Sequence, residues 1–272
     1  MPQNFRQLFK AARPIIGMVH LPPLPGSPHY GGKMQAIIDA ALQDIQTLTD
    51  AGFSGMIIEN LGDAPYYPDH VPPETIAAMS VVAALVREQI KIPIGINVLR
   101  NDAQSAIAIA TAASLQFIRV NVLTGTSVTD QGLISGRAHL VARERQRLRA
   151  ENVLLFADLR VKHAAPLVER DLAQEVEDLY DRALADAIIV SGTGSGKPVD
   201  QNFLRQVKKI AGDRPVLIGS GLNLENAEEL LAVADGAIVG SAIKIDGKIH
   251  NRIDKKRARQ LVEFIVSAMA KT

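Results

Sequence analysis

The sequence predicts a single (β/α)8 barrel, or TIM barrel, over residues 1–272, and three observations lead to this prediction. The chain is 272 residues long and 47% hydrophobic, which suits one such barrel. No linker rich in proline, glycine or serine interrupts it. Eight short apolar runs, each typical of a buried parallel strand, alternate with helical stretches. These runs are 15–20, 54–60, 93–99, 115–122, 153–160, 186–191, 214–220 and 235–241.

The helical stretches between the runs show the usual signals of helix starts and faces. The clearest are 34–49, 74–89, 103–113 and 223–234. The first has apolar residues at helical spacing, which predicts one buried stripe. Pro72 and Pro73 precede the second, and proline is favoured at a helix start. Asn101 and Asp102 supply a cap for the third, which is rich in alanine.

Composition limits the function more than it defines it. There are 30 Lys and Arg residues against 29 Asp and Glu residues, so the net charge of +1 does not predict a nucleic-acid partner. The chain contains no cysteine, which excludes disulfides, thiolate catalysis and cysteine-ligated metals. No apolar stretch reaches the roughly eighteen residues of a membrane span, and the N-terminus lacks the apolar core of a signal peptide. We therefore expect a soluble or at most peripheral protein.

Two glycine-serine turns near the end of the chain predict a phosphate site. They are Ile-Gly-Ser-Gly-Leu at 218–222 and Ile-Val-Gly-Ser-Ala at 238–242, and each follows an apolar run. Parallel strands end at one edge of the sheet, so the N–H groups of both turns would face a common point. A barrel builds its phosphate site from the loops after its seventh and eighth strands. The alternative is a pair of plain tight turns. The predicted phosphate-binding residues are Gly219, Ser220, Gly221, Gly240 and Ser241.

The glycine-rich run 191–198 resembles a nucleotide-binding loop but matches none. A P-loop needs glycine where Ser191 stands and serine or threonine where Pro198 stands. A dinucleotide fingerprint fails because Lys197 occupies its third glycine position. We predict a flexible loop beside the two glycine-serine turns, which we call the phosphate cradle. In this loop Gly192 contributes to phosphate binding and Lys197 reaches an anion.

Polar residues at the ends of the predicted strands indicate a site at the mouth of the barrel. These residues are His20, Glu59, Asn97, Arg119, Asn121 and Asp158. In the functional interpretation Glu59, Asp158 and His20 are catalytic, with a carboxylate as general acid or base, and the other three hold an oxygen-rich substrate. In the structural interpretation Arg119 only forms a stiffening ion pair with Glu59 or Asp158. Strand alternation also places Arg160 on the same side as Asp158.

Several loops add further candidates. The proline-rich run 21–30 and the run 62–68 are each expected to form a stiff lid, and the loop 123–136 to place threonine and serine hydroxyls on a substrate. Lys162 and His163 follow the fifth strand, where they bind a phosphate, shuttle a proton or are simply solvated. No spacing of His, Asp and Glu identifies a metal site, so none is predicted, and no cofactor is identified.

Several long motifs, in order along almost the whole chain, resemble the BtpA/SgcQ family. They are GMVHLPPLPGSP (17–28), ENLGDAP (59–65), VPPET (71–75), GINVLRND (95–102), FIRVNVLTG (117–125), TDQG (129–132), VKHA (161–164) and the Gly-Ser turns. The resemblance implies a barrel of the ribulose-phosphate-binding type. It also implies a role in photosystem I biogenesis in cyanobacteria, as a peripheral thylakoid protein, and a sugar- or nucleotide-related role elsewhere. The family has no agreed reaction, and Arg160 departs from the shorter side chain expected at its position.

Two classes of function follow from these observations. The first is a factor for photosystem I biogenesis, if the host is an oxygenic phototroph, located in the cytoplasm or on the cytoplasmic face of the thylakoid membrane. The second is an enzyme acting on a small phosphorylated sugar or nucleotide derivative. A basic set of residues favours docking to an anionic membrane or a photosystem component. The alternative is that these residues form an ordinary solvated helix face. A homo-oligomer is also left open. This set is Arg137, Arg143, Arg145, Arg147, Arg149, Lys255, Lys256, Arg257 and Arg259.

Overall fold

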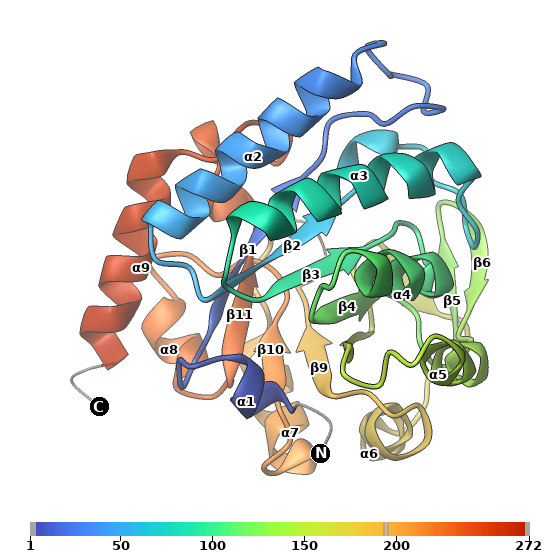
Figure 1. The fold of residues 1–272 in the computed structure, drawn as a ribbon. Helices are drawn as coiled ribbons and strands as arrows, with labels where there is room; N and C mark the ends of the chain where they lie inside the picture. The colour runs from blue at the N-terminus through green and yellow to red at the C-terminus, as the bar shows by residue number, and fades with distance from the viewer. Residues whose placement is uncertain (1–3, 193, 195, 270–272) are drawn as a thin grey trace.

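The computed structural model describes residues 4–192, 194 and 196–269, and they form a closed barrel of eight parallel strands surrounded by helices (Figure 1). The strand order around the barrel is β1-β11-β10-β9-β7-β4-β3-β2. Each strand lies inside one predicted apolar run, so the predicted (β/α)8 barrel is confirmed. The strands are β1 Ile15–His20, β2 Gly55–Glu59, β3 Ile94–Asn97, β4 Phe117–Val120, β7 Leu154–Leu159, β9 Ala187–Val190, β10 Val216–Ile218 and β11 Gly236–Val239.

Helices pack around the outside of the barrel (Figure 1). They are α1 Phe5–Leu8, α2 Met34–Asp50, α3 Pro73–Gln89, α4 Ala103–Ala112, α5 Ala138–Arg147, α6 Leu172–Glu177, α7 Gln201–Ala211, α8 Ala227–Leu231 and α9 Lys255–Met269. Asp102 caps α4 as predicted, accepting from the Ser105 N–H at 3.0 Å. Within the described part of the chain, none of the helices combines the length and apolar character that a membrane crossing requires.

Helix α8 is shorter than the predicted stretch 223–234 because asparagine side chains compete for its first backbone groups. The Asn223 side chain accepts from the N–H groups of Glu225 and Asn226, and the Asn226 side chain accepts from the Asn223 N–H at 2.9 Å. Such local bonds stabilise a turn in place of the first helical turn.

Aromatic side chains fill the N-terminal end of the barrel. Phe5 and Phe9, in and just after α1, pack against Phe117 and Phe156, whose rings stack with centroids 4.6 Å apart. Gly95 leaves the space that the Phe117 ring occupies, because a side chain there would collide with that ring. This end of the barrel is therefore closed, and the polar residues lie at the opposite end.

The loop 123–136 contains regular structure that the sequence did not predict. Strands β5 Thr126–Thr129 and β6 Gly132–Ser135 form a hairpin, and β8 Ala164–Pro166 extends it to three antiparallel strands. Ile134 is fully buried between Val122 and Val161, which fixes this small sheet on the barrel. The threonine and serine hydroxyls that were expected to contact a substrate therefore lie on this small sheet and its turns rather than in an irregular loop.

Candidate functional site

A narrow pocket opens at the C-terminal ends of the barrel strands. It brings most of the predicted site residues together from both halves of the chain. Its lining residues are Met18, His20, Glu59, Arg119, Lys162, Gly196, Gly219, Ser220, Gly221, Gly240, Ser241 and Ile249. The predicted residues Asn97, Asp158 and Gly192 are outside this lining but bond to it, and Asn121 bonds to Asn97 and Asp158.

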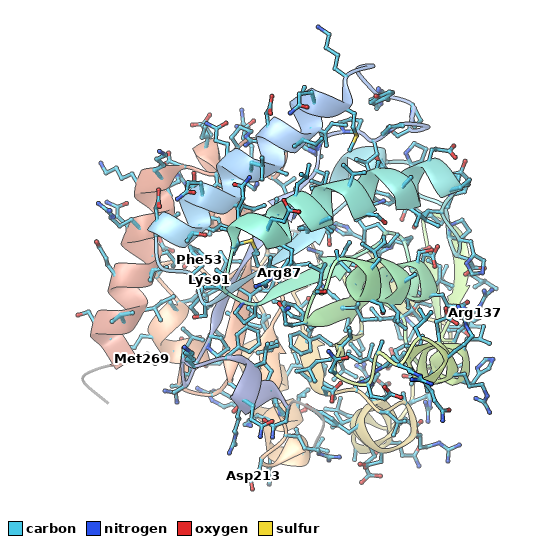
Figure 2. All side chains as sticks on the ribbon, in the orientation of Figure 1. Phe53, Arg87, Lys91, Arg137, Asp213 and Met269 are labelled. Carbon is cyan, nitrogen blue, oxygen red and sulfur yellow. The ribbon has the colours of Figure 1, made fainter. Side chains whose placement is uncertain are left out.

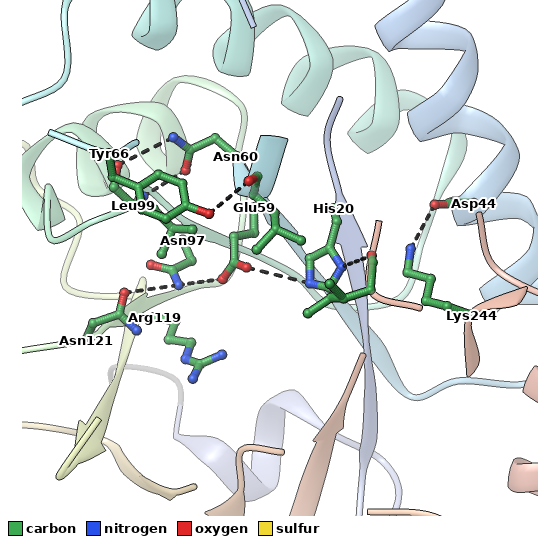
Figure 3. A network of polar contacts seen from close by, with 12 residues as sticks. His20, Asp44, Glu59, Asn60, Tyr66, Asn97, Leu99, Arg119, Asn121 and Lys244 are labelled. Atoms are coloured by element: carbon green, nitrogen blue, oxygen red, sulfur yellow. Dashed lines mark hydrogen bonds and ion pairs between the residues drawn. The ribbon is translucent and has the colours of Figure 1, made fainter. Parts of the chain in front are cut away.

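The strand register aligns three polar residues at one level of the barrel. His20 pairs with Glu59, and Glu59 with Asn97, as the last residues of β1, β2 and β3. The Asn97 amide donates to Glu59 Oε2 at 2.8 Å and reaches Asn121 Oδ1 at 3.4 Å (Figure 3). The other carboxylate oxygen of Glu59 lies 3.6 Å from His20 Nε2.

The surroundings of His20 determine which ring nitrogen carries the hydrogen and keep the ring neutral. Its Nδ1 lies 3.3 Å from the carbonyl oxygen of Ile249. Since a carbonyl only accepts, Nδ1 carries the hydrogen and Nε2 faces Glu59 with its lone pair. Burial, followed by the charges of Lys244 and Lys162, lowers the pKa of His20 well below its ordinary value of 6.5. A neutral imidazole beside a carboxyl group is suited to exchanging one proton with it.

Arg119 and Asp158 form a closed ion pair rather than an open site. Arg119 Nε and Nη2 donate to the two Asp158 oxygens at 3.0 and 2.9 Å, and Asn121 donates to Oδ2 at 2.8 Å. The Arg119 side chain is 2% exposed and that of Asp158 is 0% exposed. Burial opposes the charge of Arg119, but Asp158 more than offsets it and raises the pKa of the guanidinium. This geometry favours the structural interpretation of the pair and leaves Glu59 as the carboxylate that lines the pocket.

Arg160 does not join Asp158, so the expected alternation fails here. Strand β7 ends at Leu159, and Arg160 has a φ of 55°, which turns its side chain away from the barrel. Its guanidinium donates to Glu175 at 2.9 Å instead. A residue in the left-handed region breaks the two-residue period on which the prediction relied.

Lys162 lines the pocket, and its neighbour His163 is not among the lining residues. Burial, followed by the charge of Arg119, lowers the pKa of the Lys162 ammonium. The backbone carbonyl of Lys162 accepts from Arg100 Nη2 at 2.8 Å. The pKa of His163 is also lowered, by burial and then by Lys162.

The two predicted glycine turns face the pocket from the ends of β10 and β11, the second opening a 3₁₀ turn at Ser241–Ile243. Among the described residues, the N–H groups of Gly221 and Ser241 make no hydrogen bond, so they are available to an anion. The N–H of Gly219 donates to Val190, and that of Gly192 donates to Ser220 Oγ at 3.2 Å. Gly192 therefore positions the cradle through Ser220.

A buried ion pair that the sequence analysis missed anchors the second turn. Lys244 Nζ lies 3.2 Å from Asp44 Oδ2, and both side chains are at most 3% exposed (Figure 3). The Lys244 N–H also donates to the Ser241 carbonyl at 3.0 Å. The available signal was Asp44 itself, an acidic residue within the apolar stripe of a predicted helix.

In the described part of the chain, no group of three or more His, Asp and Glu side chains could hold a metal ion.

The fold and the pocket define a (β/α)8 barrel with a candidate site at the C-terminal ends of its strands. It resembles the solved N-(5'-phosphoribosyl)anthranilate isomerase of Pyrococcus furiosus with a TM-score of 0.58 and 13% identity, over 94% of this chain and 99% of that one. The chain belongs to the BtpA family, whose model matches residues 11–267.

Two relatives span nearly the whole chain. An uncharacterized protein of Thermococcus kodakarensis is 47% identical over 93% of this chain and 95% of its own length. The photosystem I biogenesis protein BtpA of Synechocystis sp. is 42% identical over 97% of this chain and 91% of its own length. The resemblance seen in the sequence motifs is thereby confirmed.

Proposed function

We propose that the protein is an enzyme that acts on a small phosphorylated sugar or nucleotide derivative. One observation supports this most: a single pocket is lined both by the glycine turns with their unpaired N–H groups and by the Glu59–His20 pair. An anion-binding turn alone would suit a simple binding protein. A carboxyl group facing a neutral imidazole in the same pocket adds the means to move a proton.

Each group then has a distinct role. The N–H groups of Gly221 and Ser241 bind the phosphate and so orient the substrate. Glu59 takes or gives a proton at the reacting carbon or oxygen, and His20 receives or returns it. Asn97 fixes the Glu59 carboxylate through its 2.8 Å hydrogen bond. Arg119 is neutralised by Asp158 and serves as a rigid wall of the pocket.

The phosphate cradle predicts opposite results for two substitutions of Ser241. Ser241→Asp places a carboxylate at the anion site, so inorganic phosphate binding should be lost through charge repulsion. Ser241→Ala keeps the backbone N–H and should cost at most about 1 kcal/mol, or roughly fivefold in affinity. Calorimetric titration of both folded variants with phosphate measures this. Equal phosphate affinity in Ser241→Asp and the unmodified chain would contradict the cradle.

The catalytic proposal predicts that Glu59→Gln separates binding from turnover. Glutamine keeps an oxygen to accept from Asn97 but cannot transfer the proton. Phosphate affinity should stay unchanged. A screen of phosphorylated metabolites for binding first identifies a substrate, and its turnover should then fall by about 100-fold or more. Glu74→Gln, on the outer helix α3, is the matched control and should retain full turnover. Full activity of Glu59→Gln would remove Glu59 from the chemistry.

A second candidate function comes from one relative. The Synechocystis protein is named for photosystem I biogenesis, and the identity of 42% extends that role to this chain as a proposal, if its host is an oxygenic phototroph. It would then act at the thylakoid surface with photosystem I components. Complementation of a Synechocystis strain lacking its own relative tests this through photosystem I content. The relative in an archaeon, at 47% identity, favours a chemistry that needs no thylakoid.

A further inference from the structure

We propose that Lys162 is a catalytic nucleophile that forms an imine with the carbonyl group of a phosphorylated aldehyde or ketone. The inference rests on the proposed function, because the phosphate cradle would seat the substrate beside this amine. It names a chemical class within the phosphorylated molecules proposed above: those that carry a free carbonyl group.

The backbone around Lys162 holds this residue in the pocket. Arg160 has a φ of 55° and His163 a φ of 56°, so two non-glycine residues adopt the left-handed region within four positions. Such residues are uncommon, and they persist where surrounding contacts determine the conformation. Two contacts do so here: Arg160 donates to Glu175 at 2.9 Å, and Arg100, which is 6% exposed, donates to the Lys162 carbonyl at 2.8 Å.

The pocket leaves the Lys162 amine unpaired while it pairs its neighbours. Arg119 is bound by Asp158, and Glu59 accepts from Asn97. Within the described part of the chain, Lys162 Nζ has no hydrogen bond or ion pair. Its burial and the charge of Arg119 lower its pKa, against the opposing charges of Glu59 and Asp158. A larger fraction of the amine is therefore neutral, and the neutral amine is the nucleophile.

The other lysines near the cradle do not fit this role. Lys244 is buried but tied to Asp44 at 3.2 Å. Lys197 is exposed to solvent and is not among the residues that line the pocket. Lys162 is the lysine among the residues that line the pocket.

The proposed step balances without an added reagent. The Nζ lone pair attacks the carbonyl carbon, and the carbon–oxygen π electrons move to oxygen, which takes a proton to give a carbinolamine. The carbon–oxygen bond then breaks, and the oxygen leaves as water with the two hydrogens that Nζ has lost. The product is a carbon–nitrogen double bond, and nothing is oxidised or reduced. Glu59 and His20 are placed in the same pocket to relay the protons.

Pyridoxal 5'-phosphate tests the proposal as a phosphorylated aldehyde, with pyridoxal as the probe that lacks the phosphate. The full chain is treated with each probe, reduced with borohydride and mapped by peptide mass spectrometry. We expect pyridoxal 5'-phosphate to label Lys162, saturating inorganic phosphate to abolish that label, and pyridoxal to label it far less. Lys162→Arg should lose this label, and Lys209→Arg, an exposed lysine of α7 that serves as the matched control, should be labelled at Lys162 like the unmodified chain.

Separate phosphate titration distinguishes this inference from the proposed function. If phosphate binds at the cradle but the trapped label lies on Lys197 or on scattered surface lysines, the role of Lys162 is wrong and the phosphate site stands. If phosphate does not bind and both probes label Lys162 equally, the nucleophile is upheld and the cradle is refuted. Lys162→Met provides a second variant should Lys162→Arg fail to fold.

Discussion

At the scale of single residues, two buried carboxylates at the barrel mouth differ in what remains free on them. Asp158 accepts from Arg119 and Asn121 and is fully enclosed. Glu59 accepts from Asn97 on one oxygen and faces His20 and the pocket with the other. The same kind of residue therefore stabilises the barrel in one place and is available for proton transfer in the other.

This difference predicts the effect of removing the positive partner of Asp158. Arg119→Met leaves a buried carboxylate without its counter-charge, so the free energy of unfolding should fall by about 3–5 kcal/mol. Chemical denaturation measures this. The double variant Arg119→Met, Asp158→Asn should recover much of the loss, because it removes the stranded charge. An unchanged free energy of unfolding in Arg119→Met would contradict this, because it would show that Asp158 does not need Arg119 as its counter-charge.

At the scale of elements, the eight barrel strands were predictable because each is a continuous buried apolar run. The convergence of the polar strand ends also followed from the rule that parallel strands end together. The hairpin of β5 and β6 was not predictable in this way, since it is short and partly exposed and its first strand is rich in threonine and serine. The ion-pair partner of a given charged residue could not be predicted from the sequence, because it depends on the local backbone conformation. Arg160 shows this, since its left-handed conformation turns it toward Glu175.

The segment that begins with α1 closes the barrel at the end away from the pocket, which predicts a separation of stability from binding. Phe9 is 3% exposed and packs against Phe5, Phe117 and Phe156. Phe9→Ala should lower the free energy of unfolding by about 3–5 kcal/mol through the cavity it leaves. Phosphate affinity of the folded fraction should not change. A variant that loses phosphate binding while keeping its stability would couple the two ends.

At the scale of the whole molecule, the basic residues are less available than their sequence positions suggested. Arg137 pairs with Asp69 at 2.7 Å, Arg145 with Asp186 at 3.4 Å and Arg147 with Glu144 at 2.6 Å. Figure 2 shows Arg137 at the outer edge of the molecule, near α5. With a net charge of +1 as well, these three pairs reduce the positive charge that the α5 region offers to a membrane, while Lys255, Lys256 and Arg257 on α9 stay exposed.

These pairs predict weak binding to anionic membranes. Sedimentation with liposomes rich in anionic lipid should equal that with neutral liposomes at physiological ionic strength, where screening acts beyond about 8 Å. Strong binding to the anionic liposomes that falls steeply as salt rises would contradict this and would favour direct attachment through the basic residues.

A crystal structure of the protein soaked with tungstate, a heavy phosphate analogue, tests the central claim most directly. The two glycine turns predict an anomalous peak within hydrogen-bond reach of both the Gly221 and Ser241 N–H groups, in the pocket that holds Glu59 and Lys162. A peak confined to another site, or an empty cradle at a saturating concentration, would contradict the phosphate-binding function.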